Sequence, residues 1–138
     1  VNQEHIEKYI RISKDFNIFE LQSAIGLGYF SKAFQIAKFL SSNSKENPII
    51  LILGSLHTYY QKLILLKTVG NDISRVGINP YFIDEYKRVS ERFSVKQISQ
   101  ALEYIMKADL KSKGIRGYNK KDETVLEELI LKLFSIKN

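Results

Sequence analysis

The segment that decides the fold is NPIILILGSLHTYYQKLILLKTVG, residues 47–70, which contains the most apolar part of the chain. Asn47 followed by Pro48 predicts a helix start, because a Pro at the first helical position gives up an N–H that would have no partner there. Gly70 predicts the end of this helix. Apolar residues lie on most of its circumference, which is typical of a helix at the centre of a bundle. We expect its core side chains to be Leu53, Leu56, Tyr60, Leu63 and Ile64.

The same segment is interrupted too often to predict a membrane span. Its unbroken apolar run covers only residues 49–53, and Lys62 and Lys67 lie further along. The polar opening of the chain, residues 1–4, gives no sign of a signal peptide. Since the first residue is Val and not Met, we expect the sequence to be a piece of a longer protein. We also expect the protein to be located in the cytoplasm.

Helix signals recur on both sides of the central segment. Asn17 with Glu20 and Ser94 with Gln97 have the spacing of capping boxes, and Asn79-Pro80 repeats the cap-plus-proline start. The apolar spacing predicts helices over residues 2–12, 18–25, 29–40 and 95–113 and a last helix capped by Asp122, with shorter ones near 72–76 and after 80. No stretch alternates with period two. The sequence therefore predicts an all-α bundle of about six helices joined by short loops.

Composition agrees with one globular domain. The chain has 138 residues, of which 44% are hydrophobic and 26% charged, and this length is sufficient to bury a core without a metal or a cross-link. It contains no Cys, which excludes thiolate chemistry and Cys-ligated metals and suits a reducing compartment. We expect no cofactor.

The positive charge is concentrated in one segment. Residues 110–121 contain five cations and no acid, so this window carries +5 of the net +6. Such a patch predicts a polyanionic partner. Tyr118 lies among the cations in a Gly-flanked loop, where its ring could stack on an unpaired base. The alternative is a soluble surface loop whose Tyr covers the end of the last helix. The candidate DNA contacts are Lys111, Lys113, Arg116, Tyr118, Lys120 and Lys121.

Signals of catalysis are poor. The two histidines, His5 and His57, have no visible reason to share a site, and adjacent acids such as Asp84-Glu85 are typical of a solvated helix face. Gly26-Leu27-Gly28 looks like part of a phosphate loop, but no strand precedes it and no Lys-Ser/Thr follows, so it predicts a helix-terminating turn. We expect no catalytic, cofactor-binding or metal-binding residue.

Four segments in this order carry a family resemblance: DFNIFELQSAI (15–25), the helix after Asn47-Pro48, GINPYF (77–82) and ADLKSKG (108–114). Together they resemble the C-terminal part of the delta subunit of bacterial DNA polymerase III, over nearly the whole chain. The resemblance implies a non-catalytic collar domain in the clamp loader, which packs beside the gamma/tau and delta-prime subunits and helps to load the sliding clamp on primed DNA. The contact with the clamp itself belongs to an N-terminal domain that is absent here.

The resemblance also implies a domain division. Residues 1–15 would end a preceding lid-like domain, and residues 16–138 would form the collar. The contact surfaces are expected at apolar positions left over once the core faces are filled, namely Phe39, Tyr59, Leu66 and Tyr81.

Two other classes of function stay open at this point. One is an unrelated nucleic-acid-binding module of helix-turn-helix type, for which the helix over 95–113 offers Lys96, Gln97 and Gln100. These are also ordinary solvent-facing residues. The other is a small-molecule enzyme built in a helical bundle, which lacks a polar cluster in the sequence. Base-sequence preference in DNA binding would favour the first of these two.

Overall fold

The computed structural model describes residues 16–69, 72–114 and 121–136, and this part of the chain contains helices and no strand. The predicted all-α bundle is therefore confirmed. The elements are α2 (Ile18–Leu27), α3 (Phe30–Ser42), α4 (Ile49–Val69), the 3₁₀ turns η1 (Ile73–Arg75) and η2 (Pro80–Phe82), α5 (Ile83–Arg92), α6 (Val95–Ser112) and α7 (Asp122–Ser135). The helix predicted over residues 2–12 lies outside the described residues.

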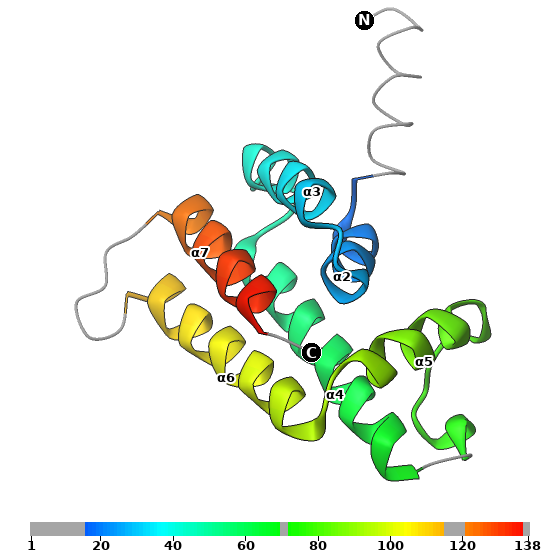
Figure 1. The fold of residues 1–138 in the computed structure, drawn as a ribbon. Coiled ribbons are helices and arrows are strands. Elements are labelled where there is room, and N and C mark those ends of the chain that lie inside the picture. Colours follow the sequence, from blue (N-terminus) through cyan, green and yellow to red (C-terminus); the bar gives the residue numbers. More distant parts are fainter. Residues whose placement is uncertain (1–15, 70–71, 115–120, 137–138) are drawn as a thin grey trace, which may run out of the picture.

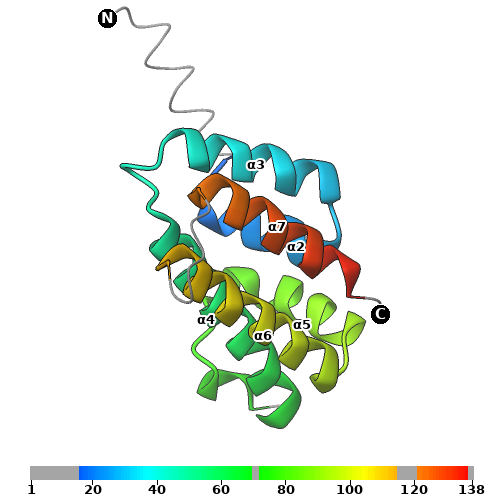
Figure 2. The same cartoon turned by 90° about the vertical axis from the view of Figure 1, so that its left-hand side faces the viewer.

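Helix α4 runs through the middle of the bundle (Figure 1). It contacts α2, α5, α6 and η1, and the packing against α6 is the most extensive. Helix α7 lies between α6 and α3, which closes the bundle on the other side (Figure 2). By length and composition α4 is also apolar enough to cross a membrane, but a core helix passes the same test, and α4 is packed as one.

The core follows the prediction for α4 with one difference. Leu53, Leu56, Tyr60 and Leu63 are buried, and Leu56 and Leu63 are fully enclosed. Ile64 is only partly buried and packs at the margin of the core. In the first turn of the helix, Ile50 and Leu51 face solvent.

The predicted helix starts are mostly confirmed. The Asn17 side chain accepts a hydrogen bond from the Glu20 N–H at 3.0 Å, and Ser94 and Gln97 form a complete capping box. Asn79 caps the 3₁₀ turn η2, so the α-helix after Pro80 begins three residues later, at Ile83. The prediction that Asp122 caps the last helix is wrong. Lys121 holds the cap position without a side-chain hydrogen bond, and Asp122 lies in the first turn, where an acid stabilises the helix dipole.

Candidate protein interface

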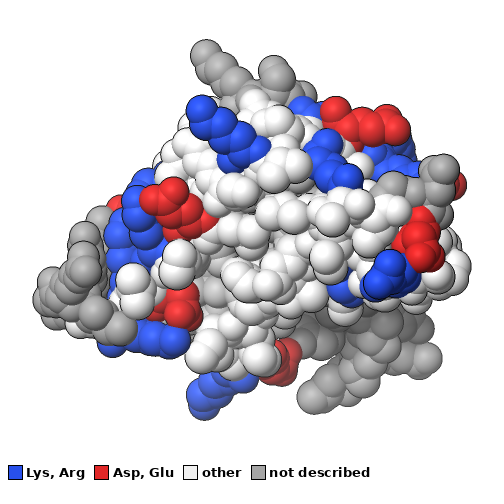
Figure 3. Space-filling view, turned by 90° about the horizontal axis from the view of Figure 1, so that it is seen from below, with Lys and Arg blue, Asp and Glu red and all other residues white. Residues whose placement is uncertain are grey.

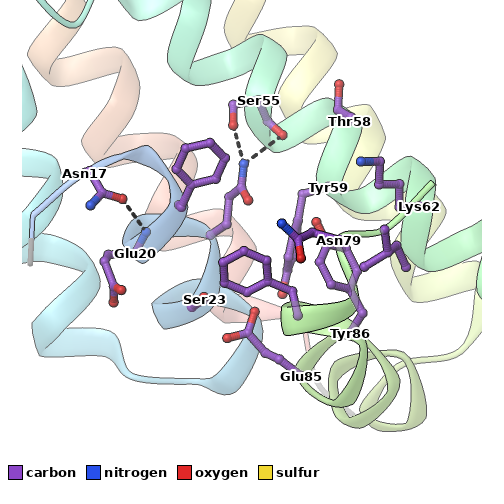
Figure 4. A pocket seen from close by; sticks show the side chains of 14 residues that line it. Asn17, Glu20, Ser23, Ser55, Thr58, Tyr59, Lys62, Asn79, Glu85 and Tyr86 are labelled. Carbon is purple, nitrogen blue, oxygen red and sulfur yellow. Dashed lines mark hydrogen bonds between the residues drawn. The ribbon is translucent and has the colours of Figure 1, made fainter. Parts of the chain in front are cut away.

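A pocket of about 690 Å³ opens between α2, α4, η2 and α5 (Figure 4). Its side chains come from several elements that the core brings together. Helix α2 and its cap contribute Asn17, Phe19, Glu20, Gln22 and Ser23, α4 contributes Ser55, Thr58, Tyr59 and Lys62, and the segment through η2 and α5 contributes Ile78, Asn79, Phe82, Glu85 and Tyr86.

Hydrogen bonds between the elements hold the pocket walls in place. The Gln22 side-chain amide donates to the Ser55 carbonyl at 3.2 Å and also contacts the Ser55 hydroxyl, which ties α2 to α4 (Figure 4). The Lys62 ammonium donates to the Gly77 carbonyl at 3.1 Å and so fixes the loop before η2 against α4. These contacts lie 33 and 15 residues apart in sequence, so only the folded bundle forms the pocket.

Tyr59 forms part of the pocket wall and is 1% exposed. Its ring packs on Tyr86 and Tyr60, with centroid distances of 4.9 and 5.6 Å. Its hydroxyl oxygen is buried and has no hydrogen-bond partner within the described part of the chain. Burial raises the pKa of Tyr59 far above the usual value of 10, and the nearby Glu85 carboxylate raises it further. The hydroxyl is therefore neutral at any physiological pH.

Three charged side chains line the pocket, and they differ in their partners. Glu20 forms an ion pair with Lys32 at 3.4 Å, and Lys62 is engaged by the Gly77 carbonyl. Glu85 makes no ion pair with any residue in the described ranges, and its side chain extends from α5 toward α2 (Figure 4). Among the described residues, the pocket therefore carries one carboxylate, Glu85, without a counter-ion.

Exposed apolar side chains accompany the pocket. Phe19, which lines it, is 65% exposed, and Tyr81, next to the lining residue Phe82, is 85% exposed. On α4, Leu51 and Leu65 share the helix face of Ser55, Thr58 and Lys62 by their spacing, and both are exposed. Exposed aromatic and aliphatic side chains beside a cavity are typical of protein-binding surfaces. We call this surface, formed by the pocket with Phe19, Leu51, Leu65 and Tyr81, the α2/α4/α5 surface.

The four predicted interface residues differ in how far they are exposed. Tyr81 is exposed, and Phe39 is half-buried with its ring 5.7 Å from that of Phe16. Tyr59 and Leu66 are buried, so the expectation that they are left over at the surface is wrong. The reason is that α2, α5, α6 and η1 pack against α4, and the sequence of α4 alone does not show which of its apolar side chains these elements cover. Phe19 was missed because it lies outside the apolar stripe of Ile18, Leu21 and Ile25, and Glu85 was missed because the Asp84-Glu85 pair is typical of a solvated helix face.

The predicted DNA contacts also differ, in their ion pairs and in whether they lie among the described residues. Lys111 pairs with Glu128 at 3.8 Å, and Lys113 pairs with Asp109 at 2.8 Å, so carboxylates from outside the 110–121 window neutralise part of its charge. Lys121 is exposed at the start of α7. Arg116, Tyr118 and Lys120 lie outside the described residues. The described part of the basic segment is thus less positive than its sequence indicates.

Charges on the face seen from below in Figure 1 are mixed. Lys and Arg lie mainly around the margin, Asp and Glu lie near many of them, and the middle is largely uncharged (Figure 3). A nucleic-acid site is expected to show a continuous basic stripe or patch, and this face has none in its described part. In the ranges that the structure describes, no three potential metal ligands come together.

A helical bundle that leaves aromatic side chains exposed around a pocket is typical of all-α interaction domains. The family model for the C-terminal domain of the DNA polymerase III delta subunit matches residues 15–133, so the chain belongs to this family. The family is that of a clamp-loader subunit and not of a catalytic polymerase unit. No curated protein and no solved structure matches the chain significantly.

Proposed function

We propose that this domain is the collar domain of a clamp-loader delta subunit, which joins the gamma/tau and delta-prime subunits in the cytoplasm and hydrolyses nothing. The exposed apolar side chains of the α2/α4/α5 surface carry the proposal, because a domain that joins other subunits must bury such groups on assembly. Family membership supports a partner within the clamp loader, and gamma/tau and delta-prime are the partners that the resemblance implies. Residues 16–138 form the collar in this proposal, and residues 1–15 lead into it from a preceding domain.

Tyr81 is the leading contact residue of this proposed interface. Its ring packs edge-on against Phe82 with a centroid distance of 5.0 Å and is 85% exposed. A Tyr side chain loses little conformational entropy on binding, because it has only two side-chain torsions. Phe39, the other predicted contact residue that keeps some exposure, lies on α3 and would form a separate contact outside this surface.

The basic segment between α6 and α7 is proposed to contact primed DNA, with Lys121 as one of its exposed members among the described residues. Lys121 makes no ion pair with another described residue, in contrast to Lys111 and Lys113. Arg116 and Lys120 would add charge that binds phosphates without reading base sequence, and Tyr118 would stack on an unpaired template base. This contact requires the assembled loader, where the primer–template junction lies.

The assembly proposal is tested by size exclusion of the chain mixed with gamma/tau and delta-prime subunits. We expect a stoichiometric complex, and we expect Tyr81→Ala to weaken it, by about 1 to 2 kcal/mol for an exposed aromatic contact. Leu131→Ala is the matched control, because Leu131 is an exposed apolar residue of α7 outside the pocket. No complex with any combination of subunits would contradict the proposal, and so would ATP turnover by the purified chain.

The helix-turn-helix alternative has a separate test. It requires that the isolated chain bind duplex DNA with a preference for base sequence, and that Gln97 or Gln100 variants lose this preference. Gln97 is already engaged in the capping box of α6, where its side chain accepts from the Ser94 N–H at 2.8 Å, and Gln100 donates to the Tyr104 hydroxyl at 2.9 Å. These contacts favour the clamp-loader proposal over this alternative.

A further inference from the structure

We propose that the pocket of the α2/α4/α5 surface binds a basic segment of a neighbouring loader subunit, with a Lys or Arg directed at Glu85 and an apolar side chain against Phe19. The inference rests on the proposed function for the identity of the partner, but the binding chemistry comes from the pocket itself. Its volume of about 690 Å³ lies within the range of about 300–1,000 Å³ for sites that enclose a bound group.

The charges of the residues that line the pocket indicate which kind of partner can bind there. The lining residues include two acids, Glu20 and Glu85, and one cation, Lys62, so the pocket is net negative on a chain whose net charge is +6. Glu20 is paired with Lys32 at 3.4 Å, whereas Lys62 keeps its charge while it donates to the neutral Gly77 carbonyl at 3.1 Å. Glu85 forms no ion pair with a described residue, so it is the carboxylate that a cation from outside can match. A phosphate backbone would meet this carboxylate unfavourably, so nucleic acid does not fit here.

The remaining lining groups suit a peptide chain. Ser23, Thr58 and Asn79 lie around the same opening as Glu85 and offer hydroxyl and amide groups to a backbone (Figure 4). Phe19, 65% exposed, offers an apolar contact next to them. A segment that combines a cation with an apolar side chain would therefore match both kinds of group at once. A few oriented polar groups beside an apolar contact are the usual arrangement in such sites.

The experiment places a photo-reactive benzoylphenylalanine in position 19 and assembles the chain with gamma/tau and delta-prime subunits. Irradiation and mass spectrometry then identify the segment held against the pocket. We expect a cross-link to one of these subunits, in a segment that contains Lys or Arg. We also expect Glu85→Lys to weaken assembly about tenfold, and replacement of the partner's cation by Glu to restore it. Glu85→Gln, which adds no repulsion, should weaken assembly less.

Glu91→Lys is the matched control, because Glu91 lies exposed on the same helix and does not line the pocket. It should leave assembly within twofold of the unmodified chain. Melting curves by circular dichroism verify that each variant is folded before its affinity is measured.

Three results would overturn the inference while leaving the proposed function intact: full affinity in Glu85→Lys, a cross-linked subunit segment without a cation, or a cross-link to a second copy of this chain. Failure of the unmodified chain to assemble with any loader subunit would instead remove the proposed function, and the inference with it.

Discussion

The hydroxyl group of Tyr59 in α4 lies against the backbone of Gly26 in α2, in the space that a side chain on residue 26 would need. Val89 of α5 reaches the same place from the other side, with its Cγ2 atom 3.0 Å from the position of such a Cβ. Three helices therefore meet at Gly26, which is buried and lies inside α2, before the left-handed Gly28 that ends the helix. Gly26 is required for close packing and not for a turn.

Gly26→Ala should destabilise the domain by about 1 to 3 kcal/mol, the usual range for an atom forced into a filled core. The added methyl group would overlap the Tyr59 oxygen and the Val89 side chain, and this overlap outweighs the better helix propensity of Ala. Unfolding by urea, followed by circular dichroism, measures the change. Combining the variant with Tyr59→Phe should recover part of the loss, because the overlapping oxygen is gone. Equal losses in the single and double variants would show that Tyr59 is not the cause.

Gly54→Ala should have the opposite sign and stabilise the domain by about 1 kcal/mol. Gly54 lies inside α4, is exposed, and a Cβ there would meet no described residue within 4 Å. Ala would then contribute its helix propensity without any overlap. The same urea titration compares the two glycines directly. A destabilising effect would show that a side chain at position 54 does collide with neighbouring atoms.

Tyr59→Phe by itself should leave the free energy of unfolding at pH 7 unchanged or raise it by up to about 1 kcal/mol, because it removes a buried hydroxyl that has no partner. The pH dependence should also change. The pKa of Tyr59 is raised in the folded chain, so below pH 10 the hydroxyl is protonated in both states and its ionisation does not reduce the stability. Above pH 10 the unfolded chain loses a proton that the native chain retains, and the native state becomes less stable. Urea titrations between pH 9 and 11 should show that the free energy of unfolding falls less in the variant than in the unmodified chain. The fall that remains comes from Tyr60 and Tyr86, whose pKa values are also raised in the folded chain.

Leu56→Ala and Leu63→Ala should each destabilise the domain by about 2 to 5 kcal/mol, since both side chains are fully enclosed in the core and truncation leaves a cavity. Leu51→Ala in the exposed first turns of the same helix is the control, with an expected change within about 0.5 kcal/mol. Thermal and urea unfolding measure all three. Losses below about 1 kcal/mol at both core positions would mean that α4 is not the centre of the bundle.

Lys121→Ser should stabilise the domain by about 0.5 to 1 kcal/mol. Lys121 is the N-cap residue of α7 but makes no capping hydrogen bond, and its positive charge lies at the positive end of the helix dipole. A Ser hydroxyl would accept from the N–H groups of the first turn. Under the DNA proposal, the same variant in the assembled loader should weaken binding to primed DNA and reduce its dependence on salt. A more stable variant with unchanged DNA binding would show that Lys121 is an ordinary surface residue and not a DNA contact.

The sequence by itself determined the helices and most of their ends. Capping signals such as Asn17 with Glu20 and Ser94 with Gln97 act between residues three apart, so they can be identified without knowing the rest of the fold. The centre of the bundle was predictable for a similar reason, because a helix that is apolar on most sides must be covered on most sides. The resemblance to the delta family also lay in the order of local segments, and the family match confirms it.

Only the tertiary structure decided which side chains are left for partners. Tyr59 and Leu66 look available in the sequence but are covered by neighbouring elements, while Phe19, an aromatic side chain that lines the pocket, stays exposed. The cation Lys111 looks unopposed in the sequence, yet Glu128 of the next helix lies beside it. The pocket joins Gln22 to Ser55 across 33 residues. Such relationships depend on how helices pack against one another, and the periodicity of a single helix shows how wide its apolar face is but not which neighbour will cover it.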